Sequence, residues 1–98
     1  MPKYVLSRRA VSDLGTIWHY TNETWSENQA DKYYQLLVEG FEQIIQMPGK
    51  GRNYDEIEKG LKGLRVGKHV IFYLTTKTRV EIVRILHERM DLRLHFRS

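Results

Sequence analysis

The side chains best able to do chemistry lie in the second half of the chain, in or beside segments that read as strands. Four of them stand out: Lys68, His69, Arg84 and His87. A metal-free ribonuclease needs a base for the ribose 2′-hydroxyl, an acid for the leaving oxygen and cations for the charge on phosphorus. The two histidines could act as base or acid, and the two cations could hold phosphate. Alternatively, all four are ordinary strand residues, with Arg84 paired to a carboxylate such as Glu81 or Glu88.

Other reaction classes find no support in the residues. The chain has no cysteine, which excludes disulfides, thiolate zinc sites and a cysteine nucleophile. His87 and His95 are too far apart for one helix face, and no H-E-x-x-H motif occurs, so we expect no metal site. There is also no G-x-S-x-G elbow, phosphate-binding P-loop or G-x-G-x-x-G motif. We therefore expect no cofactor.

Charge is unevenly distributed along the chain. The net charge is +4, but residues 1–49 hold four Lys/Arg against six Asp/Glu, whereas residues 50–98 hold twelve against six. A basic second half could meet nucleic acid or an acidic protein partner, or could simply protect exposed strand edges from aggregation. The length of 98 residues predicts one domain, residues 1–98. Without a membrane-length apolar run or a signal peptide, we expect a cytoplasmic location.

The first half of the chain predicts a strand followed by two paired helices. "KYVLS" (3–7) reads as a short strand, and Ser7 can cap the helix that follows. A second S-x-x-Q cap, Ser26 with Gln29, starts another helix, which stops at "MPGKG" (47–51). Two apolar helical faces result: Ala10, Leu14, Ile17, Trp18, Thr21 and Trp25, then Ala30, Tyr33, Tyr34, Leu37, Phe41, Ile44 and Ile45. So short a break predicts an antiparallel helical hairpin.

The second half predicts an antiparallel meander. "GRNYDEIEKG" (51–60) is loop-like, with room for one short strand, and the strands are "LKGLRVG", "HVIFYLTT" and "RVEIVRILH". Apolar residues occur on both parities, which predicts a sheet covered at least partly on both faces. The fold class is α+β in the order β-α-α-β-β-β. A helical hairpin packs on a small antiparallel sheet that the first strand can rejoin, and the tail forms a short helix or an irregular end.

Four stretches together resemble a known family: "LSRRAVSDLGTIWHYT", "PGKGR", "LRVGKHVIFYL" and "VEIVRILHERMD". The first fits an S-x-x-A-x-x-D-L-x-x-I-W pattern, and the last fits a strand that ends in R-[IV]-L-H-x-x-M-D. In this order and at this length the chain resembles the ParE branch of the RelE/ParE superfamily of bacterial toxin–antitoxin modules. The resemblance implies the small α+β toxin fold, which agrees with the periodicity.

The resemblance also implies a function. ParE-type toxins poison DNA gyrase and arrest growth, a role linked to plasmid maintenance, and a ParD-like antitoxin neutralises them. The antitoxin binds operator DNA, so contact with DNA would be indirect, and two toxins are often bridged by an antitoxin dimer. RelE-type relatives instead cut mRNA on the ribosome. Here only His87 stands near the position of their catalytic Tyr, which leaves that alternative open. A third alternative is an inactive toxin-like protein that only binds antitoxin and regulates its operon.

Two candidate surfaces follow from the resemblance. The polar end beyond the last strand is the candidate gyrase-binding surface, with no catalytic residue: His87, Glu88, Arg89, Met90, Asp91 and Arg93. The alternative is that Met90 and Leu92 merely pack the tail onto the sheet. Apolar residues of the hairpin are the candidates for antitoxin binding: Trp18, Trp25, Tyr33 and Leu37. These four could equally belong to the core.

Overall fold

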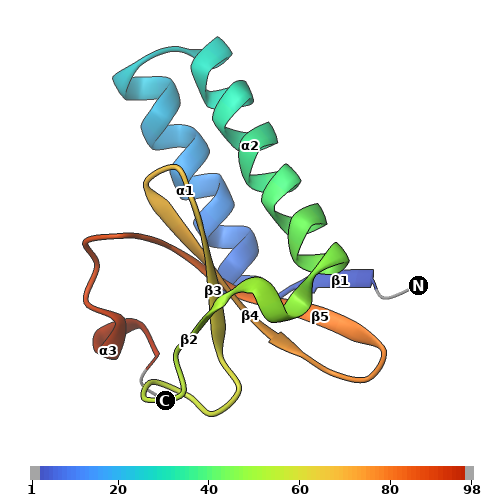
Figure 1. Ribbon diagram of the computed structural model, residues 1–98. Helices are drawn as coiled ribbons and strands as arrows, with labels where there is room; N and C mark the ends of the chain where they lie inside the picture. Colours follow the sequence, from blue (N-terminus) through green and yellow to red (C-terminus); the bar gives the residue numbers. More distant parts are fainter. Residues whose placement is uncertain (1–2, 97–98) are drawn as a thin grey trace.

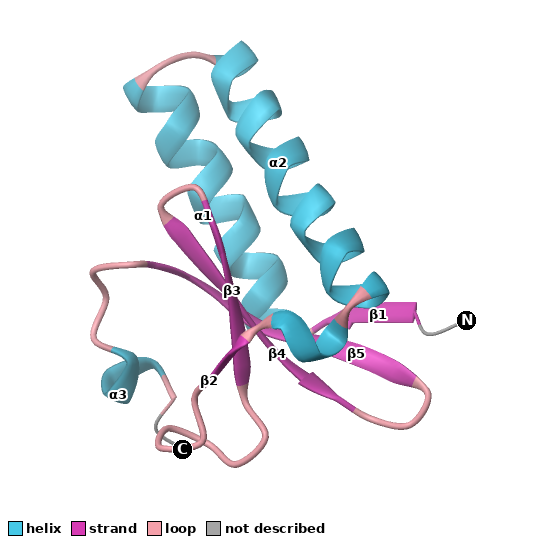
Figure 2. Ribbon diagram, viewed as in Figure 1, coloured by secondary structure: helices cyan, strands magenta, loops and turns pink. Residues whose placement is uncertain are grey.

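The computed structural model describes residues 3–96 and places a helical hairpin on one face of a sheet (Figures 1 and 2). In chain order the elements are β1 (Lys3–Leu6), α1 (Arg8–Thr24), α2 (Glu27–Gln46), the 3-10 helix η1 (Pro48–Lys50), β2 (Arg52–Asn53), β3 (Lys62–Val66), β4 (His69–Thr75), β5 (Arg79–His87) and α3 (Leu92–His95). This confirms the predicted α+β class and the order of the main elements. The short strand in the loop-like segment is β2, and the tail forms the short helix α3.

The sheet has the strand order β1-β5-β4-β3-β2 within the described residues. The meander of β2 to β5 is antiparallel, as predicted, and β1 joins its far edge parallel to β5. The pairing of β4 with β5 shifts register between Phe72 and Tyr73. Such an irregularity changes the direction in which the side chains of β5 point beyond it. It lies just before the residues of β5 that matter most below.

Two serines start the two long helices, as the sequence predicts. Ser7 Oγ accepts a hydrogen bond from the Ala10 N–H at 3.0 Å, and Ser26 Oγ accepts one from the Gln29 N–H at 3.1 Å. Each bond satisfies an amide that the first helical turn leaves free. The helices run antiparallel over the sheet (Figure 1). Close contact with the sheet requires Gly40, because a Cβ there would lie 2.8 Å from side-chain atoms of Ile71 and Val66.

The sheet is covered on both faces, as the parity of its apolar residues predicts. The main core lies under the hairpin and includes Leu37, Phe41 and Ile44 of α2 against residues such as Ile71 and Ile82 of the sheet. A smaller cluster on the opposite face contains Leu61, Phe72 and Leu86, with Leu92 and Phe96 of the tail packed against it. The C-terminal segment is therefore part of the fold and covers apolar surface.

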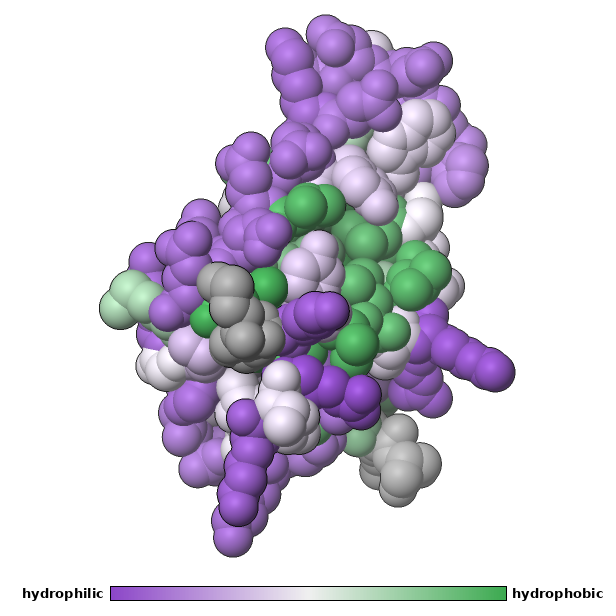
Figure 3. Space-filling model, turned by 90° about the vertical axis from the view of Figure 1, so that its right-hand side faces the viewer, coloured by the Kyte–Doolittle hydropathy of each residue, from purple (hydrophilic) through white to green (hydrophobic). Residues whose placement is uncertain are grey.

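Some hydrophobic surface remains uncovered. Figure 3 shows hydrophobic side chains gathered in the middle of the face that carries β1 and α2, between polar margins. Val5 of β1 and Leu36 of α2 are among the large apolar side chains that stay exposed, at 40% and 42%. Exposed apolar surface of this kind, rimmed by polar residues, is typical of protein-binding sites. Between residues 3 and 96, no helix has the combined length and apolarity that crossing a membrane requires.

Candidate functional site

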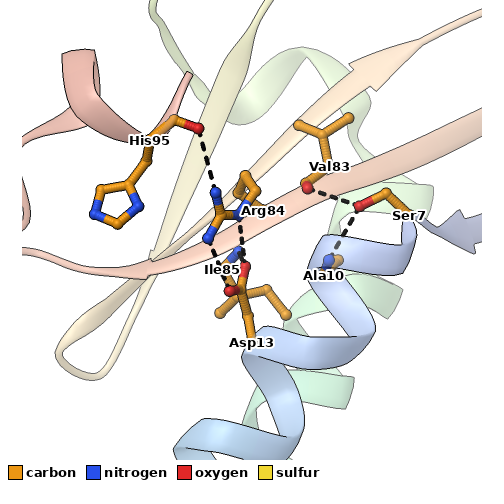
Figure 4. A network of polar contacts seen from close by, with 7 residues as sticks. All are labelled: Ser7, Ala10, Asp13, Val83, Arg84, Ile85 and His95. Carbon is orange, nitrogen blue, oxygen red and sulfur yellow. Dashed lines mark hydrogen bonds and ion pairs between the residues drawn. The ribbon is translucent and has the colours of Figure 1, made fainter. Parts of the chain in front are cut away.

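The first turns of α1 close the edge of β5 where β1 ends (Figure 4). Ser7 donates its backbone N–H to the Ile82 carbonyl at 2.9 Å and its hydroxyl to the Val83 carbonyl at 2.8 Å. In the second turn of α1, the carboxylate of Asp13 accepts the Ile85 N–H at 2.9 Å. Ser7, the N-cap of α1, and Asp13 of α1 thereby satisfy backbone groups of β5 at and beyond the end of β1.

Asp13 also forms a bidentate ion pair with Arg84 (Figure 4). Arg84 Nε lies 2.9 Å from Asp13 Oδ2, and a terminal guanidinium nitrogen lies 2.9 Å from Oδ1. Both side chains are only 14% exposed, and the other terminal nitrogen donates to the His95 carbonyl at 3.2 Å. The hydrogen bonds to Asp13 raise the pKa of Arg84 above its ordinary value. The guanidinium is thus hydrogen-bonded both to α1 and to the C-terminal tail.

The expected partners of Arg84 were wrong. Glu88 pairs with Arg65, and Glu81 lies beside Arg79 at 3.9 Å. Past the register shift, Arg84 meets α1 instead of its neighbours along the strand. Sequence reasoning missed Asp13, although the aspartate of the first helix and the arginine of the last strand belong to the two stretches that carry the family resemblance. The pair joins these two stretches in space.

His69 and His87 face each other across β4 and β5. They are register partners, and their ring centroids lie 5.3 Å apart. The Tyr33 hydroxyl lies 2.6 Å from His69 Nδ1 and also accepts the Lys68 N–H at 3.0 Å. Burial, together with the neighbouring His87, lowers the pKa of His69 from 6.5 to about 4. His69 is therefore a neutral imidazole near pH 7.

The hydrogen-bond geometry favours the same tautomer in both rings. The Tyr33 hydroxyl lies 2.6 Å from His69 Nδ1 and 3.4 Å from the Val66 carbonyl, and the shorter distance favours donation of its proton to Nδ1. His87 Nδ1 accepts the Arg89 N–H at 3.1 Å. In a neutral ring with Nδ1 as acceptor, Nε2 carries the hydrogen. In this arrangement Nδ1, the basic nitrogen of each ring, is engaged in a hydrogen bond.

A groove of about 550 Å³ opens beside the two histidines. It lies between the tip of the helical hairpin and the β3–β4 turn. Its lining residues are Tyr20, Thr21, Thr24, Trp25, Gln29, Tyr33, Gly67, Lys68, His69 and His87. Gly67 has φ +59°, and a Cβ there would lie 2.7 Å from the Tyr33 hydroxyl, so the turn needs glycine to seat against Tyr33. Below we call this the hairpin groove.

The structure brings together only part of the candidate ribonuclease set. Lys68, His69 and His87 line the hairpin groove, whereas Arg84 is not among its lining residues and is held by Asp13. Among residues 3–96 there is no group of three or more His, Cys, Asp or Glu side chains that could hold a metal ion.

Of the four residues expected to bind antitoxin, three reach the surface and one is buried in the core. Trp25 is 74% exposed, and Tyr33 is half-buried in the hairpin groove. Trp18 is half-buried and donates its indole N–H to Asp31 at 2.9 Å. Leu37 was a wrong choice, because it is fully buried in the main core. It lies on the row of α2 that faces the sheet, so no partner can reach it without opening the fold.

The residues expected to bind the target run from the last residue of β5 through an exposed bend into α3. Glu88 joins Arg65, and Asp91 caps α3 by accepting the Arg93 N–H at 3.0 Å. Glu88, Arg89, Met90, Asp91 and Arg93 are all exposed, and His87 is half-buried. The alternative, that Met90 and Leu92 both pack the tail, is right only for Leu92, since Met90 is 44% exposed. Phe96 anchors the end of the tail against Phe72, with ring centroids 5.2 Å apart.

Comparison with known proteins identifies the family. Residues 4–92 match the family model described as "ParE toxin of type II toxin-antitoxin system, parDE". The chain is 40% identical over 95 residues to Toxin ParE1 of Caulobacter vibrioides, an alignment that covers 97% of this chain and 98% of that protein. It is 36% identical over 91 residues to Toxin ParE1 of Mycobacterium tuberculosis, covering 92% and 93%.

A further relative and one solved structure agree. Toxin ParE of Escherichia coli is 32% identical over 93 residues, covering 94% of this chain and 90% of that protein. A structure titled "Chromosomal ParDE TA system from P. aeruginosa" superposes with a TM-score of 0.76 at 20% identity, over 89% of this chain and 95% of that one, which shows the same fold. The chain therefore belongs to the ParE toxins of type II toxin–antitoxin systems.

Proposed function

We propose that this protein arrests growth by binding and inhibiting DNA gyrase, and that a ParD-like antitoxin neutralises it. Membership of the ParE family motivates the proposal. The observation that carries it against the ribonuclease alternative is the pair of Asp13 and Arg84, in which the guanidinium is already bound on both sides. A cation held in this way is not available for the charge of a phosphorane.

The tautomers of the two histidines give independent support. A ribonuclease needs one group that takes a proton from the 2′-hydroxyl. His69 and His87 both use Nδ1 to accept an N–H or O–H, and so both present Nε2–H. In this arrangement the groove offers Nε2–H donors to a ligand, while the basic nitrogen of each ring is engaged in a hydrogen bond. This chemistry favours binding over catalysis.

The exposed bend after β5 is the surface we assign to gyrase. Its exposed members are Glu88, Arg89, Met90, Asp91 and Arg93, and the half-buried His87 precedes them. The bend is anchored at both ends, since the Glu88 N–H donates to the Lys68 carbonyl at 2.9 Å and Phe96 packs on Phe72. An exposed segment with fixed ends loses little conformational entropy on binding, which favours affinity.

The antitoxin would use surface left open by the fold. Trp18, Trp25 and Tyr33 remain candidates for that contact, together with the apolar area seen in Figure 3. An amphipathic antitoxin segment suits such a surface. We further infer a cytoplasmic complex in which an antitoxin dimer bridges two toxins and alone contacts DNA.

Two assays on one purified batch test this function: supercoiling of relaxed plasmid by gyrase, and cleavage of mRNA on translating ribosomes. We expect lost supercoiling and intact mRNA. Cleaved mRNA with normal supercoiling would establish the ribonuclease alternative. Activity in neither assay, with the antitoxin still bound, would indicate an inactive regulator.

A further inference from the structure

The geometry points to a specific ligand for the hairpin groove: a carboxylate side chain of the antitoxin, flanked by apolar residues. This inference rests on the proposed antitoxin partner and adds the place and the chemistry of one contact. It starts from the wall of the groove that the sheet forms, where Lys68, His69 and His87 lie together.

These three residues offer only hydrogen-bond donors to a ligand. Nδ1 of each imidazole is occupied, by the Tyr33 hydroxyl at 2.6 Å and by the Arg89 N–H at 3.1 Å, which leaves Nε2–H as the polar group available to a ligand. Lys68 adds an exposed ammonium group. A carboxylate can accept two such bonds at once, and a charged acceptor makes the stronger bonds.

The same wall is poorly suited to a metal ion. An imidazole binds a metal through an unprotonated nitrogen, usually while its other nitrogen donates to a supporting oxygen. In both rings Nδ1 instead accepts from a donor. The ligand that matches this tautomer is an anion or a carbonyl oxygen.

The charge around the groove favours one carboxylate over a nucleic-acid backbone. His69 is neutral at pH 7, because its pKa lies at about 4. Nearby, Arg65 is paired with Glu88, so that this arginine brings its own counter-ion. Lys68 is then the lysine that the groove presents. Single-stranded nucleic acid is held by a row of cations that follows successive phosphates.

The wall of the groove that the helical hairpin forms supplies the apolar part of the contact. Tyr20 is 67% exposed and Trp25 is 74% exposed, and both line the groove. Exposed aromatic side chains at the rim of a cleft are typical anchors for a protein partner. An acidic residue with an apolar neighbour would thus place its carboxylate on the histidines and its apolar group on the aromatic rings.

The groove also joins the two candidate surfaces. Trp25 and Tyr33 belong to the candidate antitoxin surface, and His87 opens the bend assigned to gyrase. An antitoxin residue seated in the groove would cover His87. Bound antitoxin and gyrase would then compete for the toxin directly.

The test compares two lysines in similar positions. Lys68 and Lys77 both lie exposed in turns of the meander, but only Lys68 lines the groove. The affinity of the antitoxin encoded with this toxin is measured by titration calorimetry for the wild type, Lys68→Met and Lys77→Met, at low and at high salt. We expect Lys68→Met to weaken binding by about tenfold and to reduce its salt dependence. Lys77→Met should stay within about twofold of the wild type.

The antitoxin side of the contact is located by a double-mutant cycle. Each Asp and Glu in its toxin-binding half is changed to the amide, and each change is combined with Lys68→Met. We expect one carboxylate to couple with Lys68, so that its loss costs little once Lys68 is gone. A Trp18→Phe toxin leaves Trp25 as the remaining tryptophan, and its fluorescence should become shielded from acrylamide in the complex.

Several outcomes would overturn the inference. Equal affinities of the two lysine variants would do so, as would the absence of any coupled carboxylate. A fluorescein-labelled single-stranded RNA that binds the wild type and is lost in Lys68→Met, with antitoxin affinity unchanged, would assign the groove to nucleic acid. Failure of the proposed function is distinguishable from failure of this inference. In the first case the wild-type toxin itself leaves gyrase active or binds no antitoxin, whereas the inference is tested by the variants.

Discussion

Removal of the Asp13 carboxylate should be among the most destabilising single changes in this chain. Asp13→Ala leaves Arg84 without its counter-ion and the Ile85 N–H without its acceptor. Asp13→Asn keeps an oxygen that can accept the Ile85 N–H but removes the charge. The two variants therefore separate the backbone contact from the ion pair.

The magnitude follows from burial. Breaking a buried ion pair by removing one partner costs about 3–5 kcal/mol. Both side chains are 14% exposed, and Arg84 keeps its bond to the His95 carbonyl, which places the cost near the lower end, at about 3 kcal/mol. Asp13→Asn should cost about 2 kcal/mol, since the hydrogen bond of the amide to Ile85 N–H recovers about 1 kcal/mol.

The assay is urea unfolding followed by circular dichroism, with the free energy of unfolding compared at constant m-value. The wild type should have several kcal/mol of stability, so that both variants still fold. The matched control is Glu81→Ala, which removes a carboxylate 3.9 Å from Arg79 in a pair whose side chains are 53% and 37% exposed. This control should change stability by less than about 0.5 kcal/mol.

A double-mutant cycle completes the test. Asp13→Ala combined with Arg84→Met should recover about 1.5 kcal/mol relative to the sum of the two single changes, because the arginine no longer lacks a partner. A structural role for the ion pair is refuted if Asp13→Ala costs no more than Glu81→Ala, or if the effects of Asp13→Ala and Arg84→Met are additive. In that case the pair would be a surface contact without a structural role.

Three further predictions concern stability and are read by the same unfolding assay. Burial lowers the pKa of His69 from 6.5 to about 4, so between these pH values the unfolded chain binds more protons than the folded chain. The free energy of unfolding should therefore fall as the pH drops from about 6.5 to about 4, and His69→Gln should flatten this part of the curve of stability against pH. Parallel curves for the wild type and His69→Gln would contradict this prediction. Ser7→Ala should cost about 1–2 kcal/mol and exceed Ser26→Ala, because Ser7 also donates to a carbonyl of β5. Gly40→Ala should cost about 1–3 kcal/mol through its 2.8 Å clash with the sheet, while Gly15→Ala, with nothing within 4 Å, should stabilise by about 0.5–1 kcal/mol; equal effects would contradict the close packing.

The elements were predictable because each leaves a local signal. Serine caps, the period of apolar residues and the short turns of the meander all act within a few residues of one another. The pairing of β1 with β5 was predictable only as a possibility, because it joins the two ends of the chain. Its parallel direction depends on how α1 leaves the strand, and no local pattern records that.

The site was less predictable, for two physical reasons. The partner of Arg84 depends on the register shift in β5 and on the point where β1 ends, which together turn the side chain toward Asp13. The apolar face of α2 contains more residues than the core buries, so the sequence pattern alone did not distinguish the buried Leu37 from the partly exposed Tyr33. In the fold Leu37 is fully buried, while Tyr33 reaches the β3–β4 turn and holds His69.

We propose that the exposed bend after β5 binds gyrase and holds no catalytic residue. Deleting the whole tail would not test it cleanly, because Leu92 and Phe96 cover the smaller core cluster. The sharper variant is Arg89→Ala, Met90→Ala and Arg93→Ala together, since these three side chains are exposed and their replacement leaves the packed residues in place.

The decisive measurement is the toxin concentration that halves gyrase supercoiling, for the wild type and this triple variant, with antitoxin binding as the check on folding. We predict that the variant binds antitoxin, leaves mRNA intact and needs at least about tenfold more protein to inhibit gyrase. A correctly folded variant that inhibits supercoiling as strongly as the wild type would contradict it.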